Sequence, residues 1–144
     1  MQKLNFNIIG AGAIGHLWAC FLKKQRHDVR LYAKHTQPEA LIEVSSPLGN
    51  FTQLINYSST SNWEPEGITI ISVKAHQLER LCQQLSQKNT NSSSIILMMN
   101  GMGLREIVLN YFPTSPVIHA SITHGALLQN HGLQHTGNGS TLMG

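Results

Sequence analysis

The stretch that decides the fold is Asn7-Ile8-Ile9-Gly10-Ala11-Gly12-Ala13-Ile14-Gly15. It joins an apolar run to a segment with helical spacing through three glycines in the order G-x-G-x-x-G. Gly10 would allow a tight turn, Gly12 would let a pyrophosphate approach the backbone, and Gly15 would let the helix pack close to the strand. The start of the helix adds free N–H groups and a partial positive charge. We therefore predict a phosphate-binding turn of the dinucleotide type.

The residues on both sides of this turn support the prediction, because a bare glycine pattern also occurs in ordinary turns. A strand-like run precedes it, with Leu4, Phe6, Ile8 and Ile9. Apolar residues then recur at helical spacing, at Ile14, Leu17, Trp18, Phe21 and Leu22. A strand that leads through glycines into a helix is the start of a βαβ unit.

The rest of the chain alternates in the same way. Strands are expected at 28–33, 68–73, 95–99 and 116–122, with helices at 78–85 and 104–111 between them. This alternation predicts an α/β fold with a Rossmann-like, doubly wound and mostly parallel sheet. Glycines at 132, 137, 139 and 144 suggest short antiparallel strands toward the C-terminus, at the sheet edge. The 144 residues fit one domain.

Three regions have weaker patterns. Residues 38–42 fit a short helical turn, whereas a hairpin of strands 41–45 and 51–55 fits the turn signal at 47–50. Residues 57–67 and 89–93 are polar and are expected to be loops. The turn at 24–27 has no glycine for the left-handed position that often ends a helix.

Composition excludes several classes of function. The net charge is +3, charged residues are few, and no basic patch is interleaved with aromatic residues, so no nucleic acid partner is expected. No apolar run approaches the roughly 20 residues of a membrane span, and no leader precedes the glycine motif. Cys20 and Cys82 fall in expected helices and should be buried free thiols. These features predict a cytoplasmic protein with no membrane or metal site.

Candidate ligand contacts follow the expected strands, because open parallel sheets bind ligands beyond the carboxyl ends of their strands. No acid stands where proteins that prefer NAD hold the ribose hydroxyl. Lys34 is near that place and would suit the 2′-phosphate of NADP, or it is a solvated surface lysine. Lys74, at a helix start that disfavours cations, suits an anionic ligand or a ribose.

Two further strand ends leave alternatives open. Asn100 lies in the sequence Asn100-Gly101-Met102-Gly103 and could contact a ribose or substrate hydroxyl, or cap the next helix. His124 could be a general acid, but without a paired acid nearby a packed or hydrogen-bonded histidine is favoured.

Taken together, these segments resemble the N-terminal domain of ketopantoate reductase (2-dehydropantoate 2-reductase). The matching segments are the glycine motif with Leu17-Trp18, Lys34 before Gln37-Pro38, Val73-Lys74-Ala75-His76-Gln77, Asn100-Gly101-Met102-Gly103, and Thr123-His124-Gly125-Ala126. The resemblance implies NADPH-dependent reduction of the 2-keto acid ketopantoate to pantoate, on the way to pantothenate and coenzyme A. Hydride would pass from the nicotinamide to the keto carbon, and a proton to the developing alkoxide.

The resemblance also implies roles for individual residues. Gly10, Ala11, Gly12, Ala13, Ile14 and Gly15 would bind the pyrophosphate of NADP(H), and Lys34 its 2′-phosphate. Lys74 and Asn100 would line the cofactor and substrate pocket, with Asn100 touching both, and Ala126 would lie near the cofactor. The family's proton-donating lysine lies in a C-terminal helical domain, so no catalytic residue is expected in residues 1–144.

The chain departs from the family pattern in two ways, and two alternative functions remain open. Arg26 stands where the family usually has glycine, at a cost of about 1 kcal/mol if that residue is left-handed. Without its second domain the chain would bind NADP(H) without turnover, and its uncovered interdomain face could self-associate. The alternatives are a non-catalytic nucleotide-sensing or partner-binding module, and a reductase for a related 2-keto acid.

Overall fold

The computed structural model describes residues 2–34, 37–88, 93–130, 132–137 and 139–144. Three α-helices occur within these residues: α1 (Ala13–Lys24), α2 (Leu78–Leu85) and α3 (Leu104–Tyr111). Two single 3-10 turns are η1 (Thr60–Asn62) and η2 (Ala75–Gln77). The strands are β1 (Asn5–Ile9), β2 (Asp28–Ala33), β3 (Glu39–Ser45), β4 (Phe51–Ser59), β5 (Ile68–Ile71), β6 (Ser94–Met98), β7 (Val117–Ile122), β8 (Gly125–Leu128), β9 (Gly132–Gly137) and β10 (Thr141–Met143).

The strands form one sheet in the order β10-β7-β6-β5-β1-β2-β4-β3-β9-β8. Its central part, from β7 to β4, is entirely parallel. This is the strand order of a doubly wound dinucleotide-binding sheet. The chain first adds strands on one side of β1 and then, from β5 on, on the other side, so the switch in strand order lies between β1 and β5. The predicted fold class is therefore confirmed. Antiparallel pairs join β10 to β7 at one edge and β8 to β9 at the other, as expected for the tail.

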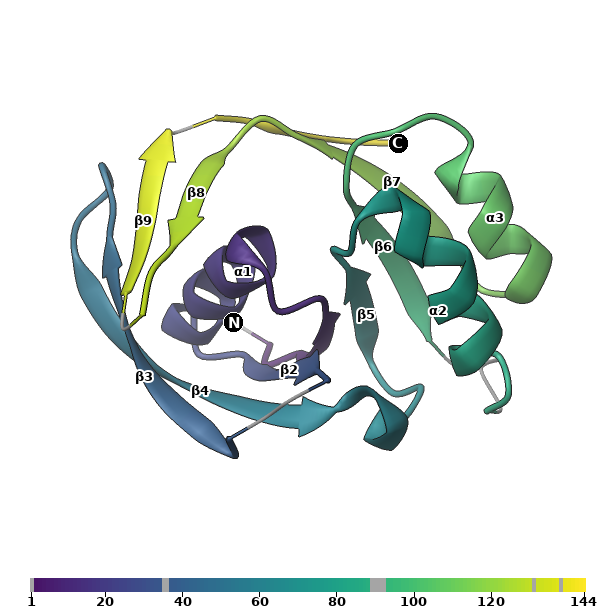
Figure 1. The fold of residues 1–144 in the computed structure, drawn as a ribbon, viewed down its shortest axis with the longest axis horizontal. Helices are drawn as coiled ribbons and strands as arrows, with labels where there is room; N and C mark the ends of the chain where they lie inside the picture. Colours follow the sequence, from purple (N-terminus) through teal and green to yellow (C-terminus); the bar gives the residue numbers. More distant parts are fainter. Residues whose placement is uncertain (1, 35–36, 89–92, 131, 138) are drawn as a thin grey trace.

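The two faces of the sheet are covered differently (Figure 1). Helix α1 lies inside the curve made by β2, β4, β3, β9 and β8, whereas α2 and α3 pack side by side against the other face. Successive residues of a strand point to opposite faces, so Ile8 joins the cluster around α1 and Ile9 the cluster with α2 and α3. Two apolar cores, one on each face, hold the strand ends in a fixed arrangement.

A hairpin takes the place of a helix between β2 and β4. Strands β3 and β4 are antiparallel, and the tight turn between them includes Gly49, with φ of +115°. The predicted hairpin is confirmed, but both strands are longer than expected, and the alternative helical turn at 38–42 is wrong. Strand β9 then pairs with β3 in parallel, which continues the sheet around α1.

The loop predicted at 57–67 starts too early. Strand β4 continues to Ser59 because it pairs with β2, and η1 follows. Trp63 is only 1% exposed and donates a hydrogen bond from Nε1 to Thr69 Oγ1 at 3.2 Å. One buried indole therefore orders a segment whose remaining residues are polar. The other predicted polar loop, at 89–93, lies outside the described residues except for Ser93, which is buried.

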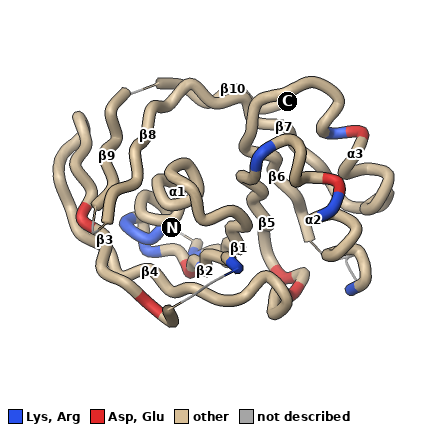
Figure 2. The backbone as a smooth tube through the Cα atoms, in the orientation of Figure 1, with Lys and Arg blue, Asp and Glu red and all other residues tan. Residues whose placement is uncertain are grey.

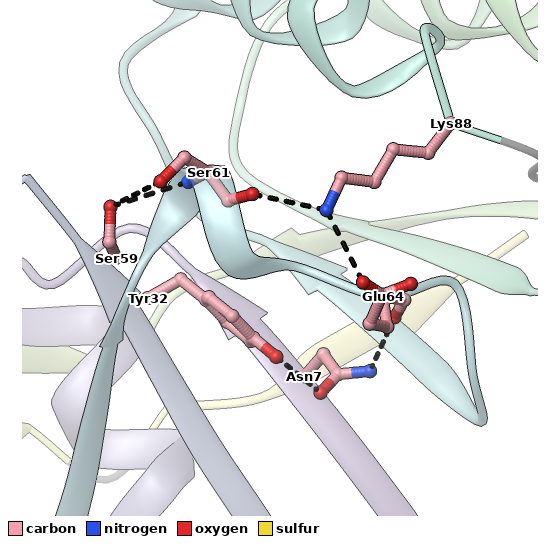
Figure 3. A network of polar contacts seen from close by, with 6 residues as sticks. All are labelled: Asn7, Tyr32, Ser59, Ser61, Glu64 and Lys88. Atoms are coloured by element: carbon pink, nitrogen blue, oxygen red, sulfur yellow. Dashed lines mark hydrogen bonds and ion pairs between the residues drawn. The ribbon is translucent and has the colours of Figure 1, made fainter.

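A network of polar contacts holds this segment against the sheet (Figure 3). Asn7 donates from Nδ2 to the Glu64 carbonyl oxygen at 3.4 Å, and the Tyr32 hydroxyl donates to Asn7 Oδ1 at 3.3 Å. Lys88 Nζ reaches both the Ser61 carbonyl oxygen and the Glu64 carboxylate. Asn7 of β1 and Lys88, which follows α2, thus hold the chain between β4 and β5, while Tyr32 of β2 positions Asn7.

Helix α1 ends at a left-handed residue that is not glycine, which meets the condition set for Arg26. Arg26 has φ of +69° and is the one non-glycine residue with positive φ in the described part of the chain. His27 donates from its backbone N–H to the Leu22 carbonyl, and Arg26 to that of Lys23. These two bonds form a Schellman motif, in which glycine normally takes the left-handed position.

Arg26→Gly should raise the free energy of unfolding by about 1 kcal/mol, because glycine adopts this conformation without a steric penalty. The melting temperature should rise by about 2–4 °C. Arg26→Ala is the control, since it removes the same charge and keeps the penalty. Equal stability of the two variants in urea unfolding would show that the charge, and not the backbone, matters.

The cysteines and the charged residues are placed as the sequence suggested. Cys20 and Cys82 are free and buried in α1 and α2, and burial raises the pKa of each thiol to about 12. Figure 2 shows lysines and arginines on several separate elements, interspersed with acidic residues. Within the described ranges, no helix is both long and apolar enough to span a membrane.

Candidate functional site

All the predicted site residues except Ala126 follow adjacent parallel strands, so they lie at the carboxyl ends of these strands. The glycine turn follows β1, Lys34 follows β2, Lys74 follows β5 and Asn100 follows β6. In strand order, Lys34 and Lys74 stand on either side of the glycine turn. The turn itself lies where the strand order reverses, which is the position of ligand sites in open α/β sheets.

The three glycines have different surroundings. Gly10 has φ of +117° and packs against Ser72, at the end of β5. A Cβ on Gly15 would overlap the carbonyl oxygen of Gly10, so α1 approaches the turn as closely as the sequence pattern suggested. A Cβ on Gly12 would meet nothing within 4 Å. Gly10 and Gly15 are therefore needed by the fold, whereas Gly12 leaves open space in front of the turn.

Several backbone N–H groups of this turn have no partner among the described residues. None of the backbone N–H groups of residues 11–15 donates a hydrogen bond within the described part of the chain. The carbonyl oxygens are turned inward instead: that of Ile9 accepts from the Ser72 backbone, and that of Gly10 from Ser72 Oγ at 3.2 Å. Free N–H groups at the start of α1 form an anion-binding surface.

Two exposed lysines flank this surface. The Lys34 and Lys74 side chains make no hydrogen bond or ion pair with any described residue. The backbone of Lys74 caps η2, since its N–H donates to Gln77 Oε1 at 3.2 Å and its carbonyl accepts from the Gln77 N–H. Within the described part of the chain, neither ammonium group has a partner that an anionic ligand would have to displace.

Asn100 has a structural partner that the sequence did not indicate. Its Nδ2 donates to the Ile122 carbonyl oxygen, and its Oδ1 accepts from the Ile122 N–H, both at 3.1 Å. The side chain thus extends the pairing of β6 with β7 beyond the strands. The alternative of a helix cap is wrong, because Gly103 caps α3 with φ of +74°. One amide hydrogen of Asn100 remains available for a ligand.

The last matching segment lies at the start of β8. Ala126 is partly buried against the cluster around α1 and is opposite His135 in the β8–β9 pair. His124 Nδ1 lies 3.3 Å from His135 Nε2, and its ring is edge-on to Trp18. Burial and the neighbouring His135 lower the pKa of His124. His124 is therefore packed and hydrogen-bonded, which is the alternative that the sequence favoured.

His16 is a polar residue of the turn that the sequence reasoning missed. It is 5% exposed in the first turn of α1, with Nδ1 at 2.9 Å from the Gly12 carbonyl oxygen and Nε2 at 2.8 Å from the Tyr57 hydroxyl. Burial lowers its pKa, although hydrogen bonds to the Gly12 and Ala11 backbone oppose this. Its place four residues after Gly12, one helical turn away, was the available signal.

Stability should fall as the pH drops from 7.5 to 5.5. Because the pKa of His16 is lowered by folding from 6.5, the unfolded chain binds more protons than the folded chain below about pH 6.5. Its contribution is therefore complete above that pH and lost on acidification, and His124 acts in the same direction. Urea unfolding at several pH values measures this, and His16→Asn should reduce the slope. An unchanged slope in His16→Asn, equal to that of the exposed-site control His76→Asn, would contradict the assignment.

A separate cavity lies away from these strand ends. It has a volume of about 650 Å³ and opens between β3, β9 and the turn of the β8–β9 hairpin, lined by Glu43, Ser45, Gln129, Asn130, Gly132, Leu133 and Gln134. None of the predicted site residues lines it. This cavity is therefore separate from the site at the glycine turn.

The sequence matches a known family over nearly its whole length. The model of the family "Ketopantoate reductase PanE/ApbA" matches residues 6–144. A similar curated protein is the 2-dehydropantoate 2-reductase of Vibrio cholerae, which is 31% identical over 144 residues, or 98% of this chain and 47% of the relative. The chain thus spans about half the length of the curated relatives it matches.

Solved structures show the same fold. The 2-dehydropantoate 2-reductase of Geobacter metallireducens has a TM-score of 0.86 at 20% identity, over 98% of this chain and 49% of that one. D-mandelate dehydrogenase, solved with NADH and anilino(oxo)acetate, has a TM-score of 0.80 at 19% identity, over 97% of this chain and 48% of that one. The family match, the fold and the glycine turn agree, and the chain belongs to the ketopantoate reductase PanE/ApbA family.

Proposed function

We propose that this chain supplies the cofactor-binding half of an NADPH-dependent 2-dehydropantoate 2-reductase, which reduces 2-dehydropantoate to pantoate for pantothenate and coenzyme A synthesis in the cytoplasm. The observation that supports it best is the set of N–H groups at residues 11–15 that donate to no described residue, flanked by two lysines whose side chains pair with none of the described residues. That arrangement fits a dinucleotide pyrophosphate with a further phosphate nearby.

Each group of residues at the carboxyl ends of the strands would bind a different part of the ligands. Residues 10–15 would hold the pyrophosphate, and Lys34 would pair with the 2′-phosphate that distinguishes NADPH from NADH. Lys74 and Asn100 would orient the nicotinamide half and the keto acid, with Ala126 close to the cofactor. When bound, the cofactor would supply the hydride for the keto carbon. The proton donor would come from the part of the enzyme that corresponds to the unmatched half of the relatives.

An exposed apolar surface is consistent with a covering domain. Met143 of β10 is 57% exposed and, because it pairs with Ala120, lies on the same face of the sheet as Ile118 of β7, which is also exposed. Exposed side chains of this kind commonly mark contact surfaces. We propose that a second, helical domain covers this surface in the complete enzyme, and that the isolated chain self-associates through it.

A second candidate is a reductase of a related 2-keto acid. The likeness to D-mandelate dehydrogenase with bound NADH favours it, because the same fold there holds a different ligand pair. Lys34 argues against a preference for NADH, since an acid usually holds the 2′-hydroxyl at this place. A non-catalytic module that binds NADP(H) or a partner protein would share the site and lack turnover in any complete form.

Calorimetric titration with NADPH and NADH tests the proposal. NADPH should bind at least about tenfold more tightly than NADH, which is about 1.4 kcal/mol, and Lys34→Ala should remove that difference. Lys3→Ala is a matched control, because it removes an equal charge at the other end of β2, where Lys3 pairs with Asp28. Equal binding of both cofactors would contradict the preference for NADPH, and no binding of either at millimolar concentration would contradict the proposed function.

A further inference from the structure

Gly12 is the least crowded residue of the proposed pyrophosphate site. Gly12 is exposed, has no neighbour in front of its Cα, and adopts extended backbone angles of −84° and −168°. Its carbonyl oxygen accepts the first hydrogen bond of α1, from the His16 N–H at 3.0 Å. It also accepts the bond from His16 Nδ1. One residue therefore contacts this oxygen twice.

The bonding pattern determines the form of the His16 ring. A carbonyl oxygen only accepts hydrogen bonds, so Nδ1 carries a proton and donates it toward Gly12. In the neutral ring Nε2 is then an acceptor, and the Tyr57 hydroxyl donates to it. Tyr57 belongs to β4, so this chain of hydrogen bonds ties the glycine turn to a strand on the far side of β2.

The direction of the Gly12 carbonyl matters for an anion. A carbonyl oxygen turned toward a phosphate would repel it, whereas the same peptide turned inward leaves the adjoining N–H groups to donate. Ser72 holds the carbonyls of Ile9 and Gly10 inward, and His16 holds that of Gly12. The three carbonyls are thus held before any ligand binds.

We propose that His16 is a positioning residue for the dinucleotide pyrophosphate: through Gly12 and Tyr57 it fixes the glycine turn in the form that binds phosphate. The inference rests on the proposed function, because it concerns the same site. His16 lies outside the glycine motif. Its substitution should weaken the contacts to the pyrophosphate and leave the contacts to the other parts of NADPH unchanged.

The test compares two ligands and three variants of the full chain. His16→Ala should raise the dissociation constant for NADPH about tenfold, and leave that for 2′-AMP, which has the 2′-phosphate and no pyrophosphate, within about twofold. His16→Asn places an amide donor near the position of Nδ1 and should restore most of the affinity for NADPH. Tyr57→Phe removes one hydroxyl and should weaken NADPH binding about threefold, which keeps the test decisive if His16→Ala does not fold.

The outcomes separate the two proposals. If wild-type chain binds NADPH and neither His16→Ala nor Tyr57→Phe weakens it, the role of His16 is wrong and the proposed function stands. Equal weakening of NADPH and 2′-AMP, without rescue by His16→Asn, means general loosening of the fold and also overturns the role. If the wild-type chain binds neither ligand, the proposed function fails and this inference fails with it.

Discussion

Gly15→Ala should abolish folding, or lower the free energy of unfolding by at least about 3 kcal/mol. The added methyl group would overlap the carbonyl oxygen of Gly10 and approach Ser72 Oγ to 3.0 Å. Alanine is the better helix former by about 1 kcal/mol, so helix propensity alone would predict a gain. The overlap outweighs that gain because its neighbour is backbone, which cannot move without displacing β1 or α1.

Urea unfolding followed by circular dichroism measures this effect, and a matched control lies three residues away. Gly12→Ala makes the same chemical change at the other end of the turn, where no atom lies within 4 Å. A Gly15→Ala chain as stable as the wild type would show that α1 does not pack on the turn as described.

Gly12→Ala should have the opposite outcome, with stability retained and binding lost. Its backbone angles suit alanine, and the cost of a poorer helix cap is offset by reduced freedom of the unfolded chain, so stability should change by less than about 0.5 kcal/mol. The methyl group would stand in the space through which a pyrophosphate approaches the N–H groups. We expect affinity for NADPH to fall at least about a hundredfold, or about 2.7 kcal/mol.

Calorimetry and thermal unfolding of the same sample check both halves of this expectation. Lys34→Ala provides the comparison, because it should affect NADPH and leave NADH unchanged, whereas Gly12→Ala should affect both. Unaltered NADPH binding by a folded Gly12→Ala chain would mean that the dinucleotide does not cross the glycine turn.

Local patterns were sufficient for the parallel core of the fold. Apolar runs and glycine turns predicted its strands and helices, and β2 has the bounds that were expected. The left-handed conformation of Arg26 was raised only as a condition, through the family resemblance, because the local sequence has no glycine to mark the end of the helix. Each of the predicted strands and helices is decided by residues within about two helical turns in the sequence.

Features that depend on distant partners were not predicted. Strand β4 is long because it pairs with β2, and Trp63 is ordered by the core beside α2 and α3. The pairing of β3 with β9 brings together segments that share no local signal. For the same reason helix capping was an open alternative for Asn100, whose actual partner, Ile122, is 22 residues away.

We expect the N–H groups of residues 11–15 to bind the pyrophosphate of NADP(H). Amide NMR spectra of the isotope-labelled chain, recorded during titration with NADPH, test it most directly. The largest shifts should occur at Ala11, Gly12, Ala13, Ile14 and Gly15, with smaller shifts at Lys34, Lys74 and Asn100. Shifts confined to the cavity between β3 and β9, around Glu43 and Gly132, would contradict it.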